Sequence, residues 1–92
     1  MGLNVSDPNA VFETNVSDNL ASQLSTRQRQ VISLAATGLD ATEIAKQLGL
    51  AAVTVRQELS KCYKILIPNP RPGTDLRTAA VLRYLRETRS LD

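Results

Sequence analysis

A helix predicted over residues 52–66 carries a polar and basic face whose side chains suit recognition chemistry. Arginine and glutamine present paired hydrogen-bonding groups, hydroxyls donate or accept, and lysine supplies a compact positive charge. A solvated surface is the ordinary alternative, because exposed helix faces are commonly charged. At about 100° per residue, this face and its flanks comprise Val53, Thr54, Arg56, Gln57, Ser60, Lys61 and Lys64.

The opposite side of the same helix is apolar, which predicts that it packs against a core. The residues of this stripe recur at helical spacing and are Ala52, Val55, Leu59, Cys62 and Leu66. Because Cys62 lies within the stripe, we expect a small core residue in preference to a redox sensor. The polar face is therefore predicted to point away from the protein interior.

The segment before Gly38 has the start signal and the apolar pattern of a shorter helix. Ser25 and Gln28 form a capping box, in which each side chain bonds the backbone of the other, and predict a helix over about 26–37. Its buried side is predicted to consist of Val31, Ile32, Leu34, Ala35 and Ala36.

A second capping box, Asp40 with Glu43, predicts a helix over 41–48 that Gly49 ends. Only two residues separate Gly49 from the helix that begins at residue 52. A connection this short forces a sharp angle, so that the second helix braces the third. This arrangement is the plan of a helix-turn-helix.

Residues 67–73 contain three prolines at alternate positions and are predicted to form a stiff, extended loop, since proline breaks the helical hydrogen-bond ladder. Thr74 is then expected to cap a fourth helix over about 75–88. The sequence has no strand-like alternation, so the predicted fold is an all-α bundle of four helices.

The fourth helix has two apolar faces, although a helix at the edge of a small bundle needs only one. The first face consists of Leu76, Ala80 and Tyr84, and the second of Val81, Leu82 and Leu85. The second face predicts a further partner. That partner is either a second copy of the chain or the N-terminal segment, folding back through Val11, Phe12 or Leu20.

Charge divides the chain into an acidic leader and a basic domain. Residues 1–24 carry three acids and no base, whereas residues 25–92 carry all eleven Lys and Arg against six acids, giving net charges of −3 and +5. Residues 1–23 are polar and predicted to be a disordered or loosely ordered leader, followed by one domain over 24–92. A small basic domain favours a polyanionic partner.

The composition excludes several classes of function. The chain has no His, no Trp and one Cys, which excludes a Cys/His zinc site, a His-dependent catalytic relay and an intrachain disulfide. The sequence has neither a nucleophile–base pair nor a phosphate-binding Gly loop, so we expect no enzyme and no cofactor. No apolar run approaches the ~18 residues of a membrane span, and a cytoplasmic protein without membrane contact is expected.

Several motifs resemble the LuxR/GerE-type DNA-binding domain, without a gap from Leu24 to about Ile67. The opening, Leu24–Ile32, is similar to the family's Leu-Ser/Thr-x-Arg-Glu-x-x-Val-Leu, and Leu34–Asp40 to its Leu-x-Ala-x-Gly-Leu-Ser. Further similarities, to Glu-Ile-Ala, Leu-x-Ile, Thr-Val-Lys and Arg-x-x-Ala-Val, lie at Glu43–Ala45, Leu48–Leu50, Thr54–Arg56 and Arg77–Val81.

The resemblance implies a helix-turn-helix module that binds double-stranded DNA and regulates transcription. It puts Arg56, Gln57 and Ser60 at base-contacting positions, where Arg suits guanine and Gln suits adenine. Val53 is expected to meet a thymine methyl group, with a plain exposed valine as an equal alternative. The expected phosphate contacts are Thr54, Lys61, Lys64, Arg27 and Lys46, the last two with solubility as an alternative role.

The resemblance also favours a homodimer in which Val81, Leu82 and Leu85 of the fourth helix meet their copies. RNA polymerase or another regulator is a further class of partner. Such a protein is expected in the cytoplasm of a bacterium or of a phage-infected cell, on DNA.

Three features depart from the family pattern. Gln28 replaces the usual Glu, Glu58 stands where the family often has His, and the Pro-rich loop adds about seven residues. We expect Glu58 to pair with Lys61 within its helix. Glu58 and the loop leave open a protein-interaction module that sequesters or bridges another regulator. A promoter-recognition module like region four of a sigma factor is the other alternative.

Overall fold

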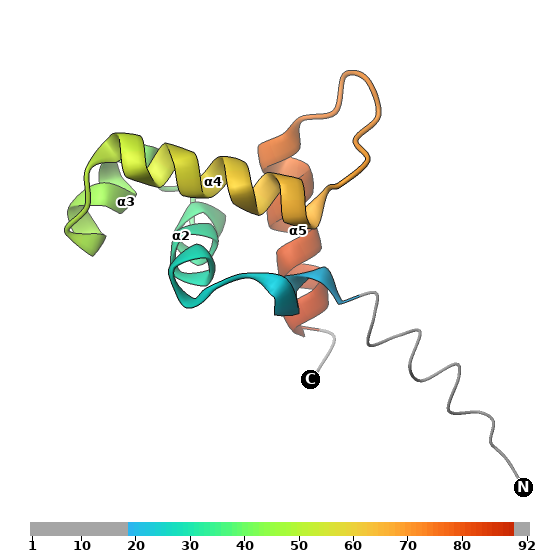
Figure 1. Cartoon of the computed structure of the whole chain (residues 1–92), viewed down its shortest axis with the longest axis horizontal. Helices are drawn as coiled ribbons and strands as arrows, with labels where there is room; N and C mark the ends of the chain where they lie inside the picture. Colours follow the sequence, from blue (N-terminus) through green and yellow to red (C-terminus); the bar gives the residue numbers. More distant parts are fainter. Residues whose placement is uncertain (1–18, 90–92) are drawn as a thin grey trace, which may run out of the picture.

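The computed structural model describes residues 19–89, and this part of the chain contains helices only, which confirms the all-α prediction. Each α-helix begins and ends within one residue of the range predicted from the sequence. In chain order, the elements in Figure 1 are a 3-10 turn η1 (Leu20–Gln23) and the helices α2 (Thr26–Ala36), α3 (Ala41–Leu48), α4 (Ala52–Leu66) and α5 (Leu76–Arg89).

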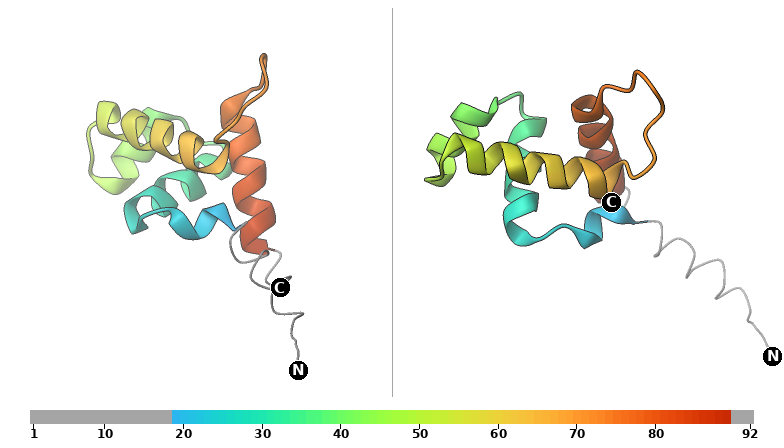
Figure 2. Two further views of the ribbon diagram at one scale, coloured as in Figure 1. Left: turned by 45° about the vertical axis from the view of Figure 1, so that its right-hand side comes forward. Right: turned by 45° about the horizontal axis from the view of Figure 1, so that its top comes forward.

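Helix α4 is central, because every other element of the described part packs against it. In Figures 1 and 2, α3 lies at the N-terminal end of α4 and α5 crosses its C-terminal end. The loop between α4 and α5 projects from α4 on the side opposite η1. The remaining side of α4 faces outward.

Both predicted capping boxes are present. At the start of α2, Ser25 Oγ accepts the Gln28 N–H at 3.1 Å, and Gln28 Oε1 accepts the Ser25 N–H at 2.8 Å. Asp40 and Glu43 make the corresponding pair of hydrogen bonds at the start of α3, each at 2.9 Å. A cap of this kind stabilises a helix by about 1 kcal/mol, so short local patterns fix where α2 and α3 begin.

The core forms where the apolar stripes of α2, α3 and α4 meet. Val31, Ile44, Val55, Cys62 and Leu66 have no exposed surface. Burying one aliphatic side chain of this size stabilises the fold by about 1.5–3 kcal/mol. The buried face of α4 therefore determines which of its side chains point outward.

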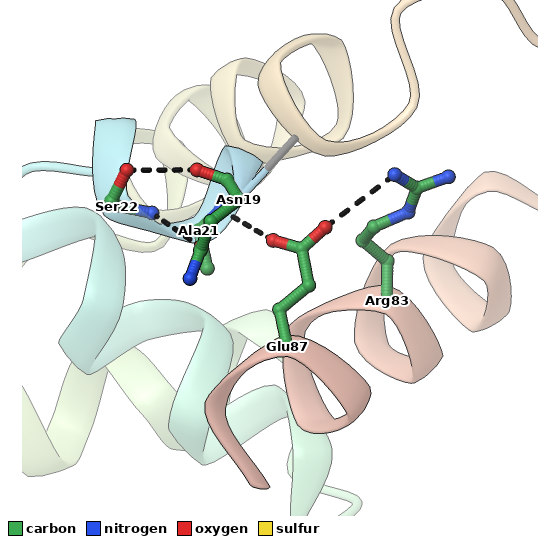
Figure 3. A network of polar contacts seen from close by, with 5 residues as sticks. All are labelled: Asn19, Ala21, Ser22, Arg83 and Glu87. Carbon is green, nitrogen blue, oxygen red and sulfur yellow. Dashed lines mark hydrogen bonds and ion pairs between the residues drawn. The ribbon is translucent and has the colours of Figure 1, made fainter. Parts of the chain in front are cut away.

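Residues 19–23 were predicted as part of the leader, and in the structure they pack against α4 and α5 as the turn η1. Figure 3 shows that Glu87 of α5 contacts this turn: its Oε1 accepts the Ala21 N–H at 2.7 Å, and its Oε2 lies 3.4 Å from Arg83 Nη1. Ala21 itself is buried. This contact places the first described residues beside the C-terminal half of α5.

Of the three residues through which the leader was predicted to cover the fourth helix, the structure describes only Leu20. Leu20 packs against the core within η1, and η1 contacts α5. Val11 and Phe12 lie outside the described residues, as do residues 1–18 as a whole, for which a loosely ordered leader was predicted.

The start of the fourth helix differs by one residue from the prediction that Thr74 caps it. Asp75 Oδ1 accepts the Thr78 N–H at 3.1 Å, so Asp75 is the capping residue. The Thr74 N–H instead donates to the Arg71 carbonyl at 3.1 Å and closes a turn. Asp is a better helix-capping residue than Thr, which agrees with Asp75 as the cap.

Candidate nucleic-acid interface

The connection between α3 and α4 is tight and has a defined geometry. Gly49 ends α3 with φ +70°, a left-handed conformation that L side chains rarely adopt. The Leu50 N–H donates to the Ala45 carbonyl at 2.9 Å, and Ala51 is extended before α4 begins. The turn therefore couples the direction of α4 to that of α3, as the sequence predicted for a helix-turn-helix.

The outward side of α4 carries the residues predicted to contact bases. Val53 is 56% exposed, so its side chain is accessible from solvent. We call this surface the polar face of α4; its exposed members are Val53, Arg56, Gln57, Ser60 and Lys64. Because α4 is a regular helix, these side chains lie along one continuous strip.

Among the predicted phosphate contacts, two lie beside the polar face and two lie on other helices. Lys61 is exposed and Thr54 half-buried on the same edge of α4, while Lys64 belongs to the face itself. Arg27 is exposed in the first turn of α2, and Lys46 is exposed in the last turn of α3. All of the predicted cations are thus accessible.

Glu58 pairs across the fold and not along its own helix. Gln28 Nε2 of α2 donates to Glu58 Oε1 at 3.4 Å, so the carboxylate is turned toward α2 and away from the polar face. The expected pair with Lys61 is replaced by this contact. The two single-residue departures from the family pattern, at positions 28 and 58, therefore meet in one hydrogen bond.

Cys62 lies beneath the Gln28–Glu58 contact and behaves as a core residue. Its Sγ lies 3.6 Å from the Gln28 carbonyl oxygen, to which the thiol donates. Burial, with a smaller contribution from the Glu58 charge, raises the pKa of the thiol to about 11. The thiol is protonated at neutral pH, which makes it a poor nucleophile and disfavours a redox role.

Arg77 is an important residue whose role could not be predicted from the sequence. Its Nη2 donates to the Leu39 carbonyl at 2.6 Å and to the Ala35 carbonyl at 3.3 Å. These carbonyls lie at the end of α2 and in the turn that leads to α3. One guanidinium from α5 therefore stabilises the position of the helices that brace α4.

Replacing Arg77 with alanine should lower the free energy of unfolding by about 1–3 kcal/mol, because two partly buried carbonyls lose a charged donor. In a domain of this size that corresponds to a fall in melting temperature of roughly 4–8 °C per kcal/mol. Thermal unfolding followed by circular dichroism measures the change. Arg77→Met, which keeps the aliphatic stem but no donor, should lose nearly as much. Wild-type stability in Arg77→Met would show that packing, and not hydrogen bonding, is the contribution.

The outer side of α5 is incompletely covered by the described part of the chain. Leu82 is 58% exposed, and Val81 and Leu85 are half-buried. Leu82 and Leu85, together with Arg86 and Arg89, line a shallow hollow of about 550 Å³. On the other apolar face, Ala80 is fully buried and the Tyr84 hydroxyl lies 2.8 Å from Ser33 Oγ, whereas Leu76, at the start of the helix, is 37% exposed.

The described residues contain no group of three or more His, Cys, Asp or Glu side chains that could hold a metal ion. Within the same residues, no helix has both the length and the apolar character to cross a membrane.

Comparison with protein families identifies residues 22–66 with one model, GerE, described as bacterial regulatory proteins of the luxR family. The match begins in η1, covers α2 and α3, and ends at the last residue of α4. It confirms the resemblance noted in the sequence as far as Leu66, and the motif at Arg77–Val81 lies outside the matched residues. No curated protein and no solved structure matches the chain.

Proposed function

The helix-turn-helix part of this chain, residues 22–66, belongs to the LuxR family of bacterial regulatory proteins, and from this premise we propose that the protein binds specific sites on double-stranded DNA. Helix α4 lies in the major groove, which is wide enough to admit an α-helix. The observation that carries the proposal is the polar face of α4, which the rest of the described fold braces but leaves uncovered.

In this proposal the polar face reads the bases. Arg56 suits the O6 and N7 atoms of guanine, Gln57 suits the N6 and N7 atoms of adenine, and Ser60 can pair with either kind of edge. Val53 packs against a thymine methyl group. Exposure supports these roles, because all four side chains are accessible from one direction.

The phosphate contacts in the proposal come from three helices. Thr54, Lys61 and Lys64 contact the backbone from α4, while Arg27 and Lys46 contact it from α2 and α3. Contacts of this kind orient the protein on the duplex without reading sequence. The Gln28–Glu58 hydrogen bond supports the arrangement, since it draws the one carboxylate of α4 toward the protein.

We further propose that two copies act together through the outer side of α5. Val81, Leu82 and Leu85 form the contact, and each copy presents one α4 to a half-site. The exposed surface of Leu82 supports this role, because an apolar patch on α5 is stabilised when a symmetric partner covers it. A regulator of this kind works on DNA in the cytoplasm, with RNA polymerase or another regulator as a further partner.

Binding to a random duplex over a salt series tests DNA binding without knowledge of the operator. The four proposed cationic contacts predict that log K falls with log salt at a slope of about −3 to −5 per copy. Fluorescence anisotropy with a labelled 30-base-pair duplex measures it. A flat response or absence of binding would favour the alternative, a protein-interaction module. Selection from randomised duplexes then identifies the specific site.

A further inference from the structure

The Pro-rich loop between α4 and α5, residues 67–75, has a fixed backbone at its tip. The Thr74 N–H donates to the Arg71 carbonyl at 3.1 Å, with Pro72 and Gly73 between them. Gly73 has φ +82°, the conformation required at the third position of a type II turn, and proline suits the second. Pro70 precedes Arg71, so prolines restrict the backbone on both sides of this residue. Arg71 is thus an exposed cation on a stiff support.

The loop lies beside the polar face of α4. A hollow of about 280 Å³ is lined by Ser60 and Lys64 of that face, and by Pro68 and Pro70 of the loop. In Figures 1 and 2 the loop stands out from the end of α4 on the side opposite η1. The loop therefore forms a raised border next to the surface that we propose enters the groove.

The two edges of the polar face have different neighbours. At about 100° per residue, Tyr63 lies roughly 100° to one side of Lys64, and Lys61 lies roughly 60° to the other side. Tyr63 lines the hollow with the loop, whereas Glu58, on the Lys61 side, contacts α2. The loop and α2 thus adjoin opposite edges of the face.

A helix in the major groove has a sugar–phosphate strand along each edge. Lys61 and Thr54 can reach only the strand on their own side. We propose that the loop carries Arg71 to the strand on the opposite side, so that both backbones are contacted by one copy of the chain. This inference rests on the proposed function and extends it to a phosphate-binding site outside the segment that matches the family.

Charge and distance agree with this assignment. Arg71 and Asp75 are the charged residues of the loop, and Asp75 caps α5, where hydrogen bonds from Thr78 lower its pKa. Its charge is thereby directed to the positive end of a helix. From Gln57 to the end of α4 at Leu66 the helix axis rises about 14 Å, the length of about four base pairs. The contact should therefore lie near the end of the base-contacted site.

The test compares wild type and Arg71→Ala on a single half-site duplex that the selection above supplies. One phosphate contact acting through counterion release contributes about fivefold in affinity at 0.15 M salt and about one unit of salt slope. We expect Arg71→Ala to lose this roughly fivefold affinity and this unit of salt slope, and Arg71→Lys to retain most of each. Arg71 contributes only its backbone to the turn, so truncation leaves the loop intact.

Trimming the duplex locates the contact. Removing the base pairs that Arg71 contacts, at one end of the duplex, should lower the affinity of wild type about fivefold. The affinity of Arg71→Ala should stay the same, because this variant already lacks the side chain that contacts the removed phosphate. Arg89→Ala, which removes an exposed cation at the far end of α5, should bind the single half-site, where no second copy is needed, as wild type does. Equal affinity of wild type and Arg71→Ala on every duplex, with Lys61→Ala weakened, would overturn the inference and leave the proposed function standing. Failure of wild type to bind any duplex would refute the proposed function itself.

Discussion

Arg56→Ala should lower affinity for the selected site by about 1–3 kcal/mol, or roughly 5- to 150-fold, while affinity for random duplex changes much less. The reason is that a bidentate contact to guanine exists only on the correct sequence, and truncation leaves the base edge unpaired. Arg56 is exposed and lies away from the core, so the variant should unfold at the wild-type temperature. Paired titrations of specific and random duplex give the ratio that decides the assignment.

Two variants serve as controls for this result. Gln57→Ala should behave like Arg56→Ala but relax specificity at a different base pair. Lys61→Ala should weaken specific and random binding by similar factors, because a phosphate contact carries no sequence information. If all three variants lowered both affinities equally, the polar face of α4 would be a phosphate-binding surface, and base reading would have to come from another element.

The parts of the fold that the sequence predicts are those determined within a few residues. The starts of α2 and α3 follow from capping boxes, whose two members are three residues apart in the sequence. The orientation of α4 follows from an apolar stripe with helical period. In these elements the capping hydrogen bonds and the apolar stripe join residues that are only three or four positions apart in the sequence. The same locality explains the small error at α5, where Thr74 and Asp75 compete for the role of cap.

Contacts between distant residues could not be predicted in this way. Gln28 and Glu58 are 30 positions apart, and neither residue type specifies the other as a partner. Arg77 is recognisable in the sequence only as part of a motif, because its acceptors are main-chain carbonyls that any residue supplies. Assigning its role requires knowing that α5 passes the end of α2. Such contacts appear only when the helices are placed in space.

The second apolar face of α5 is an intermediate case. The sequence predicts that Val81, Leu82 and Leu85 need a partner, since one buried face is sufficient for an edge helix. The structure shows that the three side chains differ in exposure: Leu82 is 58% exposed, while the other two are half-buried. A substitution at Leu82 therefore perturbs the outer surface with the least effect on the fold of a single copy.

Leu82→Glu should reduce affinity for a duplex with two half-sites about one helical turn apart by roughly a hundredfold or more. Two linked copies bind a duplex with two half-sites about 10²- to 10⁴-fold more tightly than one copy binds one half-site. A carboxylate buried at the symmetric interface would separate the copies and remove that gain in affinity. Binding to a single half-site should stay close to wild type. The variant should keep its helical content, because the side chain already lies largely in solvent.

The oligomeric state separates dimer loss from simple charge repulsion on DNA. Leu82→Ser adds no charge, so it should also weaken the two-half-site complex, by a smaller factor, and leave the single half-site unaffected. Analytical ultracentrifugation at tens of micromolar should give a dimer for wild type and a monomer for Leu82→Glu. If wild type sedimented as a monomer, both alone and on the two-half-site duplex, α5 would not be the dimer contact. The uncovered side of Leu82 would then need an occupant other than a second copy, and the single α4 would have to account for all of the sequence specificity.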